Sequence, residues 1–275
     1  MSPWLETIGV ILIALSGAVL GRVLSRLKRS YWAFGYFLPA FLIVCLVLSR
    51  CTTSLAFAPA FYWATASRAR FVILSVATTV GLTAPLSRLP RRSEKLIVCA
   101  VMVVVVAWFS VMPFLVPALI QDELSNLPTR IDSQGVCFQS TAFTCAPAAA
   151  VTVLRRLGLP AHEGEIAILA HTSPVAGTLP GCLKTALQNR YGDAGLKCEY
   201  RHFDSMEQLR DAGLTLAVIK DSFLTDHCVA VLDVSDETVT LADPVLGEMR
   251  MSRGQFEKLW RFTGVVVTRD SFESI

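Results

Sequence analysis

The stretch at residues 139–157, QSTAFTCAPAAAVTVLRRL, indicates the start of a folded domain. From Cys145 onward, small and apolar residues recur at the spacing of one face of a helix. Thr144 is a residue type that favours the N-cap, and Pro147 fits the first turn of a helix. Gly158 and Pro160 then end the pattern. The stretch therefore predicts a helix over 145–157 that carries a cysteine at its N-terminus.

Helices precede strands in the rest of this half. Two further helices are predicted over 163–170 and 180–191. Runs of β-branched residues bounded by Asp, Gly and Ser then predict strands, at 198–203, 214–220, 227–234, 238–243 and 262–269. This order predicts an α+β domain over residues 135–270, in which a helical subdomain packs on an antiparallel sheet.

The first 120 residues have a different character. The chain as a whole is 53% hydrophobic with a mean hydropathy of +0.52, and four apolar stretches lie at 4–24, 31–48, 71–86 and 96–120. Because a membrane-spanning helix needs about 20 mainly apolar residues, we expect a block of about four transmembrane helices over 1–120, followed by a linker at 121–134. Residues 54–66 could be an interfacial segment or a weak fifth span.

The charges of the N-terminal half follow the apolar stretches. Residues 1–120 contain eleven Lys and Arg residues but only two acidic ones, Glu6 and Glu94. The basic residues lie between apolar stretches, so their charge gives no indication of nucleic-acid binding. Four spans would place eight of them on one side of the bilayer and three on the other. This asymmetry predicts a multi-pass protein of the cell (inner) membrane with an extracytoplasmic C-terminal domain, whereas five spans would leave the orientation undecided.

Four residues form a candidate catalytic set. A cysteine at a helix N-terminus, such as Cys145, is placed to act as a thiolate nucleophile. His227 opens a predicted strand and Asp243 ends the next one, so a hairpin would bring the carboxylate beside the imidazole. Gln139, six residues before Cys145, could donate to an oxyanion together with the Cys145 N–H. Asp243 could instead be a turn residue before Pro244.

Several passages together resemble a known family. They are residues 139–158 (QSTAFTCAPAAAVTVLRRLG), 177–192 (GTLPGCLKTALQNRYG), 227–234 (HCVAVLDV) and 242–260 (ADPVLGEMRMSRGQFEKLW). They are similar to the bacteriocin-processing, double-glycine-leader peptidases, which are papain-like cysteine peptidases usually found at the N-terminus of peptide-exporting ABC transporters. The resemblance covers about residues 139–267.

The resemblance implies a role for each candidate residue. It makes Cys145 the nucleophile, His227 the general base and acid, Asp243 the residue that orients the histidine, and Gln139 the oxyanion donor. It also implies a peptide or small precursor protein as substrate, cut after a Gly-Gly pair, without a cofactor or metal. The expected protein is thus a membrane-anchored cysteine peptidase. The alternative is a non-catalytic peptide-binding or assembly module with the same fold at the membrane.

The chain departs from the family pattern in three respects. Ala146 follows the nucleophile where the family usually has Gly, and Cys228 follows the histidine where an aromatic residue is common. The sequence has no Walker-type GxxxxGK[ST] motif, and the apolar spans precede the peptidase region. Coupling to export would therefore come from a separate ABC-type peptide exporter or be absent.

Four cysteines remain in the C-terminal half once Cys145 is set aside. They are Cys137, Cys182, Cys198 and Cys228. An even number outside the cytoplasm permits two disulfides, and the alternative is four reduced, buried thiols. A zinc site is disfavoured because no C-x2-C or H-x3-H pair occurs.

Overall fold

The computed structural model describes residues 3–26, 34–52, 57, 59–222 and 225–270. The chain divides into two compact units, Met1–Leu119 and Ile120–Ile275. Each unit has its own core.

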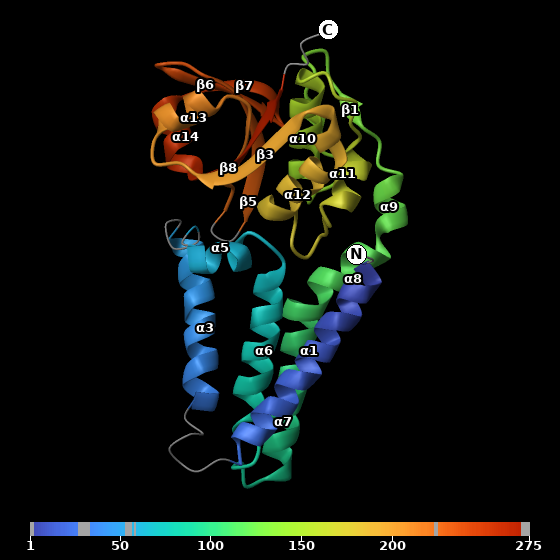
Figure 1. Ribbon diagram of the computed structural model, residues 1–275, viewed down its shortest axis with the longest axis vertical. Coiled ribbons are helices and arrows are strands. Elements are labelled where there is room, and N and C mark those ends of the chain that lie inside the picture. The colour runs from blue at the N-terminus through green and yellow to red at the C-terminus, as the bar shows by residue number, and fades with distance from the viewer. Residues whose placement is uncertain (1–2, 27–33, 53–56, 58, 223–224, 271–275) are drawn as a thin grey trace. The chain divides into compact units, whose positions relative to one another are not determined.

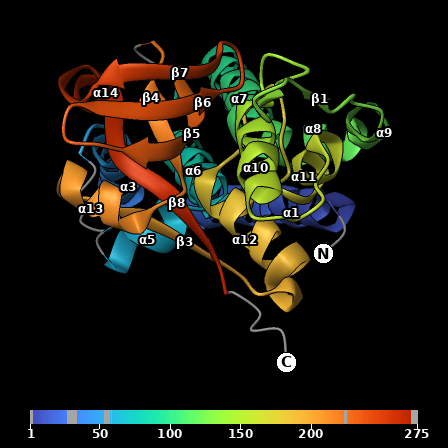
Figure 2. The ribbon, with the colours of Figure 1, turned by 90° about the horizontal axis from the view of Figure 1, so that it is seen from above.

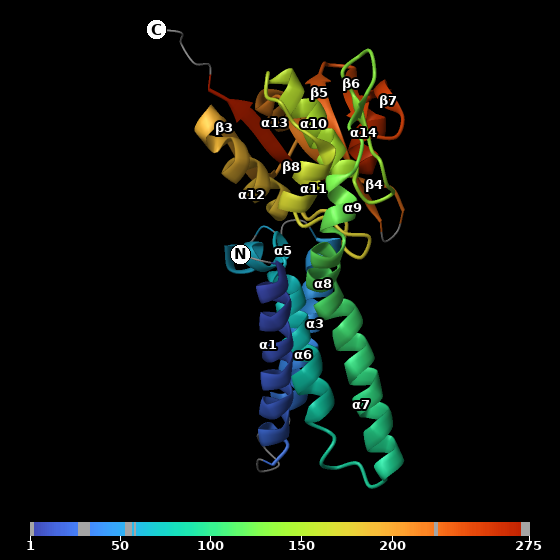
Figure 3. The same cartoon turned by 90° about the vertical axis from the view of Figure 1, so that its right-hand side faces the viewer.

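The first unit is helical (Figures 1 and 3). It contains α1 (Pro3–Leu24), α3 (Phe34–Cys51), α5 (Pro59–Thr65), α6 (Ala69–Thr83) and α7 (Arg92–Val106), and α7 continues through a π-helical turn (Ala107–Val111) into α8 (Met112–Leu119). These helices overlap the four apolar stretches of the sequence. The ambiguous segment at 54–66 contains only α5 among its described residues.

Two of the four expected spans have the length and composition to cross a membrane. Pro3–Leu24 and Arg92–Leu119 meet that requirement, whereas the apolar helices Gly35–Ser49 and Ala69–Thr83 are shorter. A helix of 15 residues is about 22 Å long, less than a hydrocarbon core of about 30 Å. The expectation of about four full-length spans is therefore supported for two helices among the described residues.

The packing of α1 on α6 places small residues inside the unit. A Cβ atom added at Gly17 or Gly21 would overlap the side chains of Thr79 and Thr83 on α6, so these glycines permit the close approach. The Thr79 hydroxyl donates to the Ser75 carbonyl of its own helix, at 2.8 Å. Large apolar side chains of α1 point outward and are exposed, among them Leu5, Ile8, Leu12, Leu15 and Val19. The helix thus has its large apolar residues on the outside.

The second unit combines helices with a six-stranded antiparallel sheet. Its elements before the sheet are α9 (Gln121–Ser125), the short paired strands β1 (Arg130–Ile131) and β2 (Cys137–Phe138), α10 (Cys145–Arg156), α11 (Glu163–Leu169) and α12 (Pro180–Tyr191). The residues expected to form a linker, 121–134, therefore contain α9 and β1. Leu124 of α9 is buried, and the Leu124 carbonyl lies against Gly164 of α11.

The sheet has the strand order β3-β8-β4-β5-β6-β7. Its strands are β3 (Leu196–His202), β4 (Thr215–Lys220), β5 (Asp226–Val234), β6 (Thr238–Asp243), β7 (Gly247–Ser252) and β8 (Trp260–Arg269), with α13 (Met206–Ala212) and α14 (Arg253–Leu259) between them. In Figure 2, α10, α11 and α12 lie on one side of the sheet and α13 and α14 on the other.

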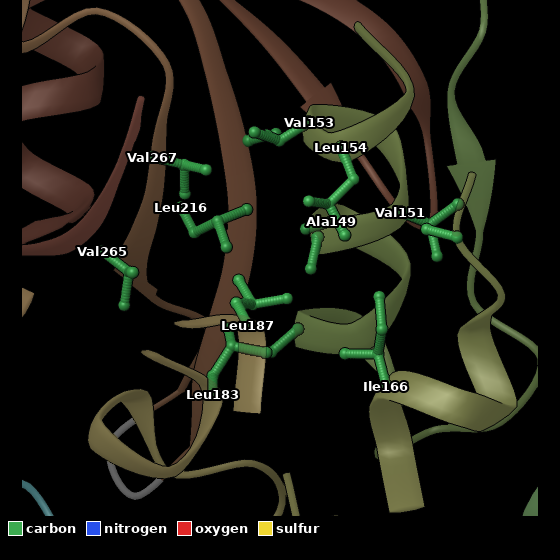
Figure 4. Close-up of a cluster of buried hydrophobic side chains, with 14 of the residues drawn as sticks. Ala149, Val151, Val153, Leu154, Ile166, Leu183, Leu187, Leu216, Val265 and Val267 are labelled. Carbon is green, nitrogen blue, oxygen red and sulfur yellow. The ribbon is translucent and has the colours of Figure 1, made fainter. Parts of the chain in front are cut away.

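Alternating strand residues fill two hydrophobic clusters, one on each face. Leu216, Val265 and Val267 pack with α10 and α12 in the first cluster, which Figure 4 shows together with Leu154 and Leu187. Residues of the opposite parity, such as Val229 and Val266, pack with Phe203, Phe256 and Trp260 in the second cluster. This two-residue period is what a sheet covered on both faces requires. The prediction of helices packed on an antiparallel sheet is confirmed.

The sequence did not predict α13 or β7. Ser205 is the N-cap of α13, and its hydroxyl accepts a 3.4 Å hydrogen bond from the Gln208 N–H. The strand β7 has the sequence GEMRMS, which lacks the β-branched residues that identified the other strands. It is an edge strand that pairs with β6 on one side.

The cysteines of the second unit exclude the alternative with two disulfides. Two disulfides would need all four candidates, and three of them, Cys137, Cys198 and Cys228, are free thiols buried in the first cluster. Burial raises the pKa of both Cys137 and Cys198 to about 12, so these thiols are inert packing residues.

Candidate active site

Cys145 is the first residue of α10, the helix that packs against β5. The preceding residue, Thr144, is the N-cap, but its hydroxyl does not cap the helix. Instead it accepts a hydrogen bond from the Thr141 N–H at 3.1 Å. No side-chain cap therefore occupies the first-turn N–H groups next to the thiol. Partial positive charge at a helix N-terminus favours a thiolate there.

His227 and Asp243 come together at one end of the sheet. His227 is the second residue of β5 and Asp243 the last residue of β6. These strands pair antiparallel, with Ala230 opposite Ala242, so the beginning of one lies beside the end of the other. His227 Nε2 lies 3.1 Å from Asp243 Oδ1. The hairpin expected from the sequence thus makes the predicted contact.

The same histidine also contacts the cysteine. Cys145 interacts with the His227 ring and, like Asp243, acts to raise the pKa of that histidine. Because Nε2 faces the carboxylate, Nδ1 is the ring nitrogen left for the thiol. Thiol, imidazole and carboxylate therefore form one continuous line of contacts drawn from α10, β5 and β6.

The environment favours a charged pair of histidine and aspartate. Burial alone would lower the pKa of His227, but the hydrogen bonds and charges of Asp243 and Cys145 outweigh it and raise that pKa to about 10. Burial likewise opposes ionisation of Asp243, yet hydrogen bonds from His227 and from the Val245 and Leu246 N–H groups hold its pKa below the ordinary value.

The backbone of Gln139 is hydrogen-bonded to the residue that follows Asp243. Its N–H donates to the carbonyl of Pro244, the residue after Asp243, at 2.9 Å. Gln139 is half-buried, and its side-chain Oε1 is buried without a hydrogen-bond partner among the described residues. The structure therefore ties the segment that carries Gln139 to the segment that carries Asp243.

The two positions that depart from the family pattern are both buried. Ala146 is 4% exposed within the first cluster. Burial raises the pKa of the Cys228 thiol, and the charges of Cys145 and Asp243 raise it further. Cys228 is therefore a poor nucleophile despite its position beside His227.

Two contacts of the site had no signal in the sequence. Glu163 is fully buried and binds Ser140, the residue after Gln139. The backbone N–H groups of Val245 and Leu246 hold Asp243. Glu163 stands at the predicted start of a helix, where an acidic residue is ordinary, and backbone donors cannot be read from residue types.

A thiol at a helix N-terminus, bonded to a histidine that an aspartate orients, defines a thiol hydrolase with the papain-type arrangement. Comparison with known proteins gives the particular family. The model of the Peptidase C39 family matches residues 134–273. The chain belongs to the peptidase C39 family and is a cysteine peptidase, which confirms the resemblance to the double-glycine-leader peptidases.

Curated relatives match the same part of the chain. An uncharacterized protein of Methanothermobacter marburgensis is 31% identical over 148 residues, which cover 54% of this chain and 98% of the relative. An uncharacterized protein of Methanothermobacter thermautotrophicus is 30% identical over 147 residues, covering 54% of this chain and 97% of the relative.

Solved structures are similar to this chain at lower identity. The peptidase domain of Streptococcus ComA, a bi-functional ABC transporter involved in a quorum-sensing pathway, is 17% identical, with a TM-score of 0.42 over 48% of this chain and 96% of that chain. A double glycine motif protease from an AMS/PCAT transporter, in complex with the leader peptide, is 15% identical, with a TM-score of 0.41 over 53% of this chain and 96% of that chain.

Proposed function

We propose that this chain is a membrane-anchored cysteine peptidase that hydrolyses a peptide bond through Cys145, His227 and Asp243. The observation that carries the proposal is the position of His227, which interacts with Cys145 and whose Nε2 lies 3.1 Å from Asp243 Oδ1. A nucleophile, a proton carrier and an orienting carboxylate are the parts that covalent thiol catalysis requires.

The reaction divides into two transfers at this site. The Cys145 thiolate attacks the scissile carbonyl carbon, and the carbonyl π electrons move to oxygen. His227 then gives its proton to the leaving amine as the C–N bond breaks and a thioester remains. In the second step His227 takes a proton from water, and the resulting hydroxide attacks the thioester. The thiolate leaves, and Asp243 keeps the ring in one orientation throughout.

Gln139 and the first turn of α10 would stabilise the oxyanion of both tetrahedral intermediates. The Gln139 side chain supplies an N–H2 donor, and its backbone hydrogen bond to Pro244 fixes the position of the residue. The Cys145 N–H at the helix start supplies a second donor. Donors fixed before the reaction stabilise developing charge without reorganisation during it.

The substrate class follows from the family resemblance. We propose a peptide or small precursor protein cut after a Gly-Gly pair that ends its leader, with a separate ABC-type exporter as a partner.

The bilayer is the proposed partner of the first unit. Pro3–Leu24 and Arg92–Leu119 are long and apolar enough to cross it, and α1 and α7 expose large apolar side chains such as Leu12, Leu15, Val103 and Val104. Water would disfavour such a surface, whereas lipid covers it at no cost. The Lys and Arg asymmetry supports a multi-pass topology with the second unit outside the cytoplasm.

Peptide cleavage by the full chain in detergent tests the proposed chemistry. The substrates are a proteome-derived peptide library and a quenched fluorescent peptide with a central Gly-Gly pair. We expect new N-termini after Gly-Gly, lost in Cys145→Ala and kept in the matched control Cys198→Ala, whose thiol lies on the edge strand β3. Cleavage that survives Cys145→Ala contradicts the mechanism. Peptide binding without any cleavage by the unmodified chain would favour the binding-module alternative.

Labelling of intact cells tests the orientation. Ser235 is exposed between β5 and β6, so a Ser235→Cys variant gives a reporter on the second unit. A membrane-impermeant maleimide should label it without lysis. Labelling only after lysis contradicts the extracytoplasmic placement and leaves the catalytic proposal intact.

A further inference from the structure

A buried carboxylate that is not part of the Cys145–His227–Asp243 set contacts the loop at 139–144, which carries the proposed oxyanion donor Gln139. Glu163, at the start of α11, is 0% exposed. Its Oε1 accepts a 2.8 Å hydrogen bond from the Ser140 backbone N–H. Its Oε2 lies 2.7 Å from the Ser140 hydroxyl, which is also 2.8 Å from the Pro128 carbonyl oxygen. One side chain thus contacts both the backbone N–H and the hydroxyl of Ser140.

The held residue lies between the two groups that would stabilise the oxyanion. Ser140 directly follows Gln139 and precedes Cys145 by five positions. The loop is fixed on both sides of the Gln139 side chain, because the Gln139 N–H donates to Pro244 and the Ser140 N–H donates to Glu163. Further along, Thr141 and Thr144 bond to each other. The loop therefore depends on Glu163 at the residue next to the proposed donor.

Glu163 is itself fixed. Its backbone N–H donates to the Thr129 hydroxyl at 3.1 Å, and the neighbouring Gly164 packs against the Leu124 carbonyl so closely that a Cβ atom would not fit. A buried carboxylate is unfavourable unless its oxygens are hydrogen-bonded. Its presence here, with both oxygens directed at one loop residue, indicates a specific positioning role.

We propose that Glu163 is a positioning residue, which sets the orientation of Gln139 by anchoring Ser140. This inference rests on the proposed function, in which Gln139 is the oxyanion donor. Glu163 contacts neither Cys145 nor His227 in any described hydrogen bond. Its effect is therefore expected in the rate of the chemical step, and the reactivity of the thiol should be independent of it.

Three variants separate this role from general stability. Glu163→Met keeps the side-chain volume but removes the acceptors, and Glu163→Gln keeps an acceptor for the Ser140 N–H and offers a donor to its hydroxyl. Glu165→Gln is the matched control, because Glu165 lies on the same helix but pairs with Arg190 at the surface. Should Glu163→Met fail to fold, Ser140→Ala removes the hydroxyl contact alone.

The kinetic test uses the full chain and the quenched Gly-Gly peptide. We expect Glu163→Met to lower kcat about 10- to 100-fold with little change in KM, since misplacing a catalytic group by about 1 Å can cost about 100-fold. Glu163→Gln should stay within about threefold of the unmodified chain, and Glu165→Gln should be unchanged. Iodoacetamide should alkylate Cys145 at the same rate in all four proteins.

Non-additivity with Gln139→Ala is the decisive readout. If Glu163 acts through Gln139, Glu163→Met should have almost no further effect in a Gln139→Ala background. The same fold-loss in both backgrounds, or a Glu163→Gln variant as slow as Glu163→Met, overturns the inference.

Hydrogen exchange gives a readout that does not need turnover. The Ser140 amide should exchange faster in Glu163→Met than in Glu165→Gln, and unchanged exchange overturns the inference even in a protein that cleaves nothing. An absence of cleavage by the unmodified chain would by itself count only against the proposed function.

Discussion

The backbone N–H of Gln139 donates a 2.9 Å hydrogen bond to the carbonyl oxygen of Pro244. The first residue lies before the nucleophile, and the second directly follows Asp243, far along the sequence. This single bond fixes the loop at 139–144 to the end of β6. It therefore fixes the backbone of Gln139, the proposed oxyanion donor, relative to the pair of His227 and Asp243.

Removal of the Gln139 amide should slow the chemical step. Gln139→Ala is expected to lower kcat about 100- to 1,000-fold with a small change in KM, because an oxyanion donor acts mainly in the transition state. Steady-state cleavage of the Gly-Gly peptide measures both constants. Gln134→Ala, at an exposed position in the turn before β2, is the control and should be unaffected. A large rise in KM with unchanged kcat would instead assign Gln139 to substrate binding.

Neutralising Asp243 should change the pH profile as well as the rate. The carboxylate raises the pKa of His227 through a hydrogen bond and its charge, so Asp243→Asn should lower that pKa. The alkaline limb of the kcat/KM profile should then move to lower pH, and activity at neutral pH should fall about 10- to 100-fold. The measurement is kcat/KM between pH 5 and 10. An alkaline limb that stays in place would show that Asp243 does not set the histidine pKa.

The stability of the second unit should decrease as the pH rises above about 6.5. The unfolded chain releases the His227 proton near the ordinary histidine pKa of about 6.5, whereas the folded chain keeps it to about 10. Between these values the folded state binds more protons, so its stability falls with rising pH. Below about 6.5 the contribution of His227 is fully present. Urea unfolding followed at several pH values should show this slope, and His227→Gln should reduce it.

The close packing of α1 on α6 should depend on Gly21. A Cβ atom there would lie 2.9 Å from the Val80 carbonyl oxygen and overlap the Thr83 side chain. Gly21→Ala should therefore destabilise the first unit by about 1–3 kcal/mol. Gly9→Ala is the matched control, since nothing lies within 4 Å of a Cβ at Gly9, and alanine favours a helix by up to about 1 kcal/mol. Loss of helical circular dichroism on heating in detergent compares the two. Equal melting temperatures would rule out this packing.

The sequence predicted the elements whose apolar residues follow a helical or alternating pattern. The helix at 180–191 and the strand at 238–243 agree with α12 and β6 in both bounds, because a helical or alternating apolar pattern records which face is buried. The sequence did not predict features that depend on contacts with another part of the chain. The strand β7 forms by pairing with β6, and the buried thiols Cys137, Cys198 and Cys228 are explained by core packing that spacing does not reveal.

The site shows the same division. Residue chemistry singled out Cys145, His227 and Asp243, since a thiol, an imidazole and a carboxylate have few other joint uses. The role of Glu163 was not visible, because an acidic residue at a helix start is common. Only the tertiary structure brings its carboxylate to Ser140. Contacts through backbone groups, such as the hydrogen bond from the Val245 N–H to Asp243, could not be predicted from the sequence either.

The contact between His227 and Cys145 is tested most directly by the site of alkylation at pH 6. Ordinary thiols react slowly there because they are mostly protonated. With limiting iodoacetamide and the full chain in detergent, peptide mass spectrometry should find Cys145 modified before the other seven cysteines. His227→Gln should remove this selectivity, while the control His162→Gln, at an exposed position, should keep it. Preferential modification of another cysteine, or selectivity that persists in His227→Gln, would contradict the proposed contact between His227 and Cys145.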